Sequence, residues 1–155
     1  MTGTTRIVLT TDFSDEAEKA YAPAMKMAER LGAKVDVVHV VEELLAIPYG
    51  APFAPPLEVG LPDLSGVEDA ARKHMDETVR KLTASVSDAV SVEGHVLRGE
   101  RAGRVVCDYA VEAGADYIAL STHGRTGIRR MIMGSIAEDI LRRTRTPVLI
   151  YPQDS

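Results

Sequence analysis

YIALSTHGRTGIRRMIMGS, residues 117–135, is the segment that indicates the class of fold most directly. Its first four residues form an apolar run typical of a buried strand, and a helix is predicted to begin near Gly134 and Ser135. A loop that carries glycine and arginine joins the two. Because the first N–H groups of a helix are unpaired and lie at the positive end of its dipole, this strand–loop–helix unit favours a bound anion such as phosphate.

Strands and helices alternate along the rest of the chain. The hydrophobic patterns predict strands at residues 6–10, 35–41, 90–97, 117–120 and 147–151, and helices at 14–31, 67–86, 102–113 and 135–143. Ser14 is the expected N-cap of the first helix, Pro23 a possible kink within it and Gly32 its end. This alternation predicts a Rossmann-like, doubly wound α/β fold: a five-stranded parallel sheet of strand order 3-2-1-4-5 with helices on both faces.

One segment interrupts the alternation. Residues 46–66 hold five of the eight prolines together with three glycines, which predicts a long loop without regular structure. A loop of this length is either a functional flap or a mobile insertion. With 155 residues in total, we expect a single domain spanning residues 1–155.

Composition narrows the class of protein. The chain is 45% hydrophobic and 26% charged, has no apolar run long enough to span a bilayer, and begins without the apolar segment of a secretion signal. We therefore expect a cytoplasmic protein with no membrane partner. The single cysteine, Cys107, fits a reducing compartment and is expected to pack in the interior. A formal net charge of −5 argues against nucleic-acid binding.

Positive charge gathers beside the glycine loop. Residues 121–147 carry a net charge of +4, which leaves −9 on the remainder of the chain. Three of the six arginines here, at 142, 143 and 145, lie at the end of a helix, where cations complement the dipole. Arg125, Arg129 and Arg130 remain as candidates to face a ligand or to lie on the solvated surface.

The predicted topology brings two polar segments together. Ligands of doubly wound sheets bind at the carboxyl ends of the strands where the winding direction reverses, here between the first and fourth strands. Residues 10–12, Thr-Thr-Asp, and residues 121–124 follow these two strands. Asp12 can accept hydrogen bonds from a base or a ribose or help to hold a divalent cation, whereas Gly124 and Gly134 allow phosphate to approach the backbone closely.

A nucleotide could bind Asp12 through its base or ribose and the glycine-bearing segment through its phosphates. The alternative is structural: Asp12 caps the first helix and the glycines only form turns. The segment is neither a Walker loop, because no lysine precedes Ser135, nor a dinucleotide fingerprint, because no G-x-G-x-x-G follows the first strand.

Several segments resemble the universal stress proteins, and together they span nearly the whole chain. They are residues 7–14 (IVLTTDFS), 37–41 (VVHVV), 114–124 (GADYIALSTHG) and 134–135 (GS), the last followed by 147–150 (PVLI). The ATP-binding branch of that family carries the pattern glycine, two residues, glycine, nine residues, glycine, then serine or threonine. Gly124, Gly134 and Ser135 fit this pattern, and Ser121 stands in place of the first glycine.

The resemblance implies an ATP site, with Mg²⁺ bound through the nucleotide and only indirectly by Asp12. Asp12 and the backbone of Val40 would recognise adenine or its ribose, and Gly134, Ser135 and the N–H of Ile136 would hold phosphate. A proline common in ATP-binding relatives is Thr10 here. The residues implied for the site are Thr10, Thr11, Asp12, Val40, Leu120, Ser121, Gly124, Arg125, Gly134, Ser135 and Ile136.

Three classes of function follow. The favoured one is an ATP-binding regulatory switch of the stress response with little or no turnover, and the others are a slow ATPase and a nucleotide-free structural dimer. The last strand, residues 148–151, would leave unpaired backbone groups at an edge of the sheet. The resemblance implies that a homodimer covers this edge, whereas in a monomer Pro147 and Pro152 could protect it.

Overall fold

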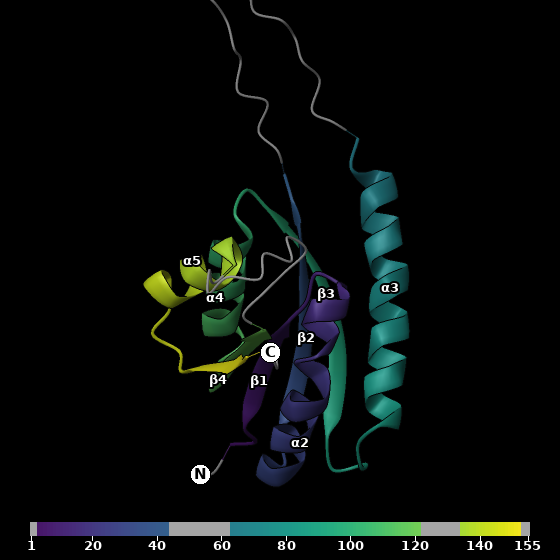
Figure 1. The fold of residues 1–155 in the computed structure, drawn as a ribbon, viewed down its shortest axis with the longest axis vertical. Helices are drawn as coiled ribbons and strands as arrows, with labels where there is room; N and C mark the ends of the chain where they lie inside the picture. Colours follow the sequence, from purple (N-terminus) through teal and green to yellow (C-terminus); the bar gives the residue numbers. More distant parts are fainter. Residues whose placement is uncertain (1–2, 44–62, 122–133, 153–155) are drawn as a thin grey trace, which may run out of the picture.

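Five parallel strands form the centre of the structure, a computed structural model that describes residues 3–43, 63–121 and 134–152 (Figure 1). The strands are β1 (Arg6–Thr10), β2 (Lys34–Glu42), β3 (Ser91–Gly99), β4 (Tyr117–Ser121) and β5 (Val148–Tyr151). Their order in the sheet is β3-β2-β1-β4-β5, and each neighbouring pair is parallel. The predicted fold class and strand order are therefore confirmed.

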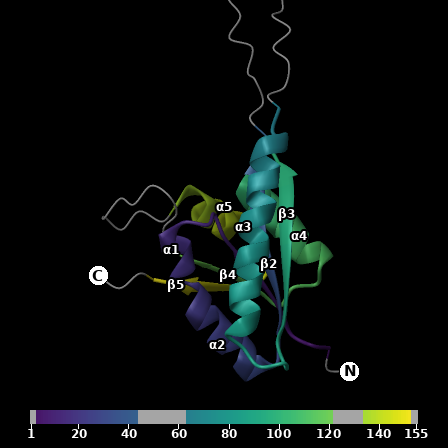
Figure 2. The same cartoon turned by 90° about the vertical axis from the view of Figure 1, so that its right-hand side faces the viewer.

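Helices cover both faces of this sheet. They are α1 (Asp15–Glu18), α2 (Tyr21–Leu31), α3 (Ser65–Ala84), α4 (Ala102–Glu112) and α5 (Ser135–Arg143). Because side chains alternate along a strand, Ile7 and Leu9 pack in one apolar cluster with α2 and α3, and Val8 packs in a second with α4 and α5. Figures 1 and 2 show α3 on one side of the sheet, alongside β3, with α4 and α5 on the other.

Two of the predicted helices differ by more than one residue from those observed. The helix expected over residues 14–31 is divided into α1 and α2, with a break at Lys19 and Ala20. Pro23 accounts for this break, because its ring would clash with the carbonyl of Lys19 in a continuous helix but is tolerated in the first turn of a new one. In addition, α3 begins at Ser65, inside the predicted loop 46–66, most of which lies outside the described residues.

A buried charge joins the first two strands to α4. Asp36 of β2 is only 1% exposed, and its Oδ2 accepts hydrogen bonds from Arg6 Nη1 at 2.7 Å and from the Tyr109 hydroxyl at 3.1 Å. A carboxylate removed from water in this way is tolerated only when charged and polar partners compensate it. Arg6 and Tyr109 are therefore structural partners of Asp36.

The described helices include none that is both long and apolar enough to cross a membrane.

Alkaline unfolding should report on this network. Burial, the nearby Asp36 charge and the hydrogen bond to Asp36 raise the pKa of Tyr109 from 10.0 to about 12. The unfolded chain then loses this proton at a lower pH than the folded one, so the free energy of unfolding should fall as the pH rises from about 10 towards 12. Tyr109→Phe should cost about 1 kcal/mol near neutrality and make this decline shallower.

Urea denaturation of both proteins between pH 7 and pH 11 would measure the effect. A decline of equal slope in the variant would contradict the assignment to Tyr109.

Candidate functional site

Several of the predicted site residues lie together at the carboxyl ends of two neighbouring strands, β1 and β4. β1 and β4 are neighbours with Ile7 opposite Tyr117 and Leu9 opposite Ala119, so their carboxyl ends lie side by side. Thr10, Thr11 and Asp12 follow at the end of β1, while Leu120 and Ser121 complete β4. This is the convergence that the switch-point argument predicts.

The turn after β1 holds the Asp12 carboxylate in a fixed orientation. Its Oδ1 accepts hydrogen bonds from the Ser14 backbone N–H at 3.0 Å and from the Ser14 hydroxyl at 2.5 Å. Ser14 Oγ in turn accepts from the Ala17 N–H at 3.1 Å, which makes Ser14 the N-cap of α1, as predicted. Asp12 therefore does not cap the helix itself but orients the residue that does.

Thr11 anchors this turn to the core. It is 7% exposed, its N–H donates to the Val38 carbonyl at 2.9 Å, and its hydroxyl accepts from the Phe13 N–H at 2.9 Å. The same hydroxyl shares a hydrogen bond with the Tyr21 hydroxyl of α2, and burial raises the pKa of Tyr21, which keeps that phenol protonated. Thr11 thus stabilises the turn that presents Asp12.

His39 is a supporting residue that the sequence did not single out as part of the site. Its Nδ1 lies 2.9 Å from the Thr11 carbonyl oxygen, which can only accept, so Nδ1 carries the proton of this bond. The Phe13 ring lies over His39, with ring centroids 4.5 Å apart, and Phe13 adopts the left-handed backbone conformation with φ 59°. His39 lies inside a nearly continuous apolar strand, so no local pattern indicated this contact.

The start of α5 offers backbone donors to an anion. Gly134 is the N-cap and has no side chain to bond the first N–H groups of the helix, and Ile136 is 41% exposed. Ala137, the next residue, packs in the same apolar cluster as Leu120. The predicted helix start at Gly134 and Ser135 is therefore present, on the α4 face of the sheet.

The remaining site residues differ in how far the structure describes them. Thr10, Val40 and Ser121 are half-buried at or near the carboxyl ends of β1, β2 and β4. Gly124 and Arg125 lie outside the described residues, as do Arg129 and Arg130. The positions of these last residues in the site stay predictions.

Two shallow hollows elsewhere on the surface, of about 460 and 470 Å³, lie beside α4. Arg104, Asp108 and Arg143 line both of them. Neither hollow is lined by a predicted nucleotide residue, so we do not place the site there.

The family model and the curated relatives that match this chain name the same family. The family model described as the universal stress protein family matches residues 3–152. The universal stress protein MJ0531 of Methanocaldococcus jannaschii is 28% identical over 149 residues, which cover 94% of this chain and 80% of the relative.

Solved structures share the fold. A universal stress protein in complex with cAMP aligns with a TM-score of 0.69 at 18% identity, covering 97% of this chain and 98% of that one. The universal stress protein of Archaeoglobus fulgidus in complex with dAMP aligns with a TM-score of 0.64 at 23% identity, with the same coverage. Both of those proteins bind an adenine nucleotide.

A double-mutant cycle should reveal the bond between Thr11 and Tyr21. Tyr21→Phe and Thr11→Val each remove one partner and should each lower the free energy of unfolding by about 1–2 kcal/mol. Because either change alone breaks the same hydrogen bond, the double variant should lose less than the sum of the two. Urea denaturation measures all four proteins, and strictly additive losses would contradict a direct interaction.

Proposed function

The chain belongs to the universal stress protein family, and we propose that it is an adenine-nucleotide-binding regulatory protein that binds ATP with Mg²⁺. The observation that carries the proposal is the Asp12 carboxylate, oriented by two hydrogen bonds from Ser14 at the edge where β1 and β4 end side by side. An acceptor held in this way suits ribose hydroxyls or the exocyclic amine of a base.

The proposed roles divide the site into two ends. Asp12 and the backbone of Val40 would bind adenine or ribose, with Thr10 and Thr11 on the same wall and Leu120 and Ser121 beside the ribose. At the other end, the N–H groups of Ser135 and Ile136 would bind phosphate, helped by the dipole of α5. Gly124, Gly134 and Arg125 would complete this end. Mg²⁺ would be held by the phosphates and reach Asp12 only indirectly.

Relatives of the same fold support the choice of nucleotide. The ligands of the two aligned complexes, cAMP and dAMP, share the adenine base and a phosphate but differ in the sugar and its linkage. Adenine is therefore the part that both of these ligands have in common with ATP. ATP as the occupant rests on the motif formed by Gly124, Gly134 and Ser135.

We favour a binding switch over turnover. The polar groups at the end of β1 are engaged in holding the turn: the Thr11 hydroxyl bonds Tyr21 and Phe13, and His39 Nδ1 bonds the Thr11 carbonyl. Such groups suit recognition better than proton transfer, which needs a base within reach of its proton. Phosphate release above background that is abolished by Asp12→Ala would instead support a slow ATPase.

Calorimetric titration with Mg-ATP tests the proposal. The wild-type protein should bind, and Asp12→Asn should weaken binding about tenfold or more, because an amide donates hydrogen where a carboxylate oxygen accepts it. The amide oxygen can still accept from Ser14, so the fold should persist. Asp15→Asn is the matched control: it removes the same charge from an exposed residue of α1 and should bind like wild type.

No heat and no thermal shift with millimolar Mg-ATP would overturn the nucleotide site. An equal loss of affinity in Asp12→Asn and Asp15→Asn would indicate a general effect of charge rather than a contact at Asp12. Ser121→Gly, which restores the family motif, completes the series: tighter binding would show that the serine β-carbon crowds the nucleotide, and weaker binding that its hydroxyl contributes a hydrogen bond.

We also propose that the protein is a homodimer joined through β5. This strand is the edge of the sheet, beyond β4, and all four of its residues remain half-exposed. Pairing with a second copy would satisfy its outer backbone groups. Analytical ultracentrifugation should therefore find a dimer at micromolar concentration, and a monomer persisting at high concentration would contradict this assembly. The cytoplasmic location expected from the sequence stays a prediction.

A further inference from the structure

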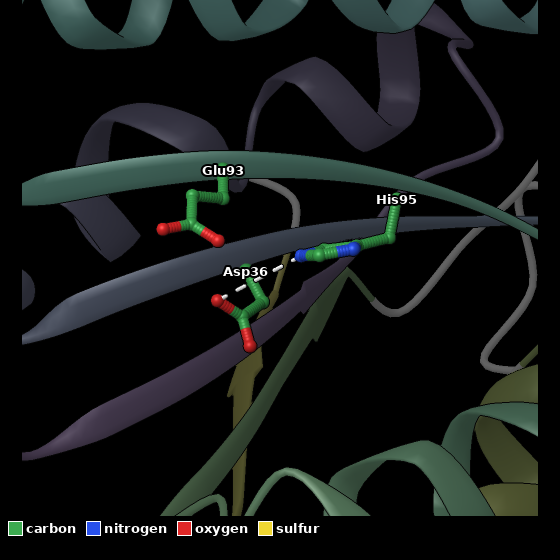
Figure 3. Close-up of side chains that lie close together, drawn as sticks. All are labelled: Asp36, Glu93 and His95. Carbon is green, nitrogen blue, oxygen red and sulfur yellow. Dashed lines mark ion pairs between the residues drawn. The ribbon is translucent and has the colours of Figure 1, made fainter.

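A cluster of three side chains lies away from the proposed nucleotide site, on the α4 face of β2 and β3. Asp36 of β2 lies opposite Glu93 of β3 in the sheet register, and His95 follows two residues after Glu93, so all three project to the same face (Figure 3). One ligand atom from each lies within 4.8 Å of the other two. Asp36 and Glu93 are the third residues of β2 and β3 and His95 is the fifth of β3, whereas the nucleotide site is proposed at the carboxyl ends of the strands.

Asp36 is fixed so that one oxygen faces the cluster. Its Oδ2 is taken by Arg6 Nη1 at 2.7 Å and by the Tyr109 hydroxyl at 3.1 Å. Its Oδ1 faces His95 Nε2 at 4.0 Å. The carboxylate is thus buried, oriented and supported from behind, which is the role that outer partners play for metal-binding carboxylates.

His95 supplies an imidazole nitrogen, Nε2, that has no hydrogen-bond partner among the described residues. This nitrogen atom is buried. The His95 ring packs beside that of Tyr109, with centroids 5.2 Å apart, so α4 limits its movement. A ring nitrogen that makes no hydrogen bond and faces the Asp36 carboxylate at ion-pair distance is available as a metal ligand.

The spacing suits a bridging cation after a small closing movement. At 4.0 Å, Nε2 and Oδ1 are too far apart for a hydrogen bond. A tetrahedral ion about 2.0–2.1 Å from each would hold these two atoms about 3.3 Å apart, so the two side chains need to approach each other by less than about 1 Å. Glu93 is exposed and lies on β3, one of the two edge strands of the sheet, so its side chain can adjust to become the third ligand. Figure 3 shows the Glu93 carboxylate above Asp36 and the His95 ring to its right.

We propose that Asp36, Glu93 and His95 bind a transition-metal dication of the Zn²⁺ class at a site separate from the nucleotide. One imidazole and two carboxylates form a ligand set that suits Zn²⁺ and Co²⁺, whereas Mg²⁺ prefers oxygen ligands alone. The two carboxylates and Arg6 together carry a net charge of −1, which attracts a dication. Three protein ligands leave a fourth position for water.

Metal titration of the untagged, nucleotide-free, chelator-treated protein tests this site. Co²⁺ should bind with a stoichiometry of one and give visible absorption bands, which one equivalent of Zn²⁺ should remove. Zn²⁺ should also raise the melting temperature, because the cluster is assembled only in the folded chain. His95→Asn and Glu93→Gln should each weaken Co²⁺ binding about tenfold or more.

The chain offers a matched control in His74→Asn. His74 is an exposed histidine on α3, on the opposite face of the sheet, and its loss should leave Co²⁺ binding unchanged. Circular dichroism would verify that each variant is folded. Absence of saturable binding by the wild type, binding unaffected by both cluster variants, or equal weakening by His74→Asn would overturn the proposal. Because nucleotide is left out, each result is independent of the ATP titration.

Discussion

The central strand β1 is buried on both faces, and the rest of the structure depends on this constraint. Ile7, Val8 and Leu9 are 0% exposed, so helices must cover the sheet on each side, and β2 and β4 must pair with both edges of the strand. Polar chemistry is thereby confined to the strand ends and to Asp36, the one charged residue that the described part of the sheet buries. The proposed nucleotide site lies where this apolar layer ends, and the proposed metal site lies at Asp36, which interrupts it.

The sequence predicted the parts of the fold that local patterns specify. Apolar runs identified the strands, the regular succession of strands and helices predicted the strand order observed in the sheet, and the helix starts at Ser14 and Gly134 followed from their residue types. The single helix over residues 14–31 was wrong, because the chain breaks at Lys19 and Ala20 and Pro23 lies in the first turn of a new helix. A proline inside a helical pattern is compatible with either a kink or a break, and only the assembled fold shows which of the two occurs.

Contacts between distant residues explain what the sequence could not indicate about the sites. Asp12 was found because it follows a strand directly, but the support of its turn by His39 joins residues 28 apart. The cluster of Asp36, Glu93 and His95 depends on the register between β2 and β3, which no residue pattern of either strand specifies alone. Such sites become visible only once the sheet is assembled.

The bond from His39 to the Thr11 carbonyl determines how the turn that presents Asp12 is held. Nδ1 donates this hydrogen bond, because a carbonyl oxygen can only accept, so Nδ1 is the protonated nitrogen of the neutral ring. Thr11 is therefore bound to β2 through both of its backbone groups: its N–H donates to the Val38 carbonyl, and its carbonyl accepts from the His39 ring. A change in the position of β2 would accordingly be transmitted to Asp12, the residue that follows Thr11.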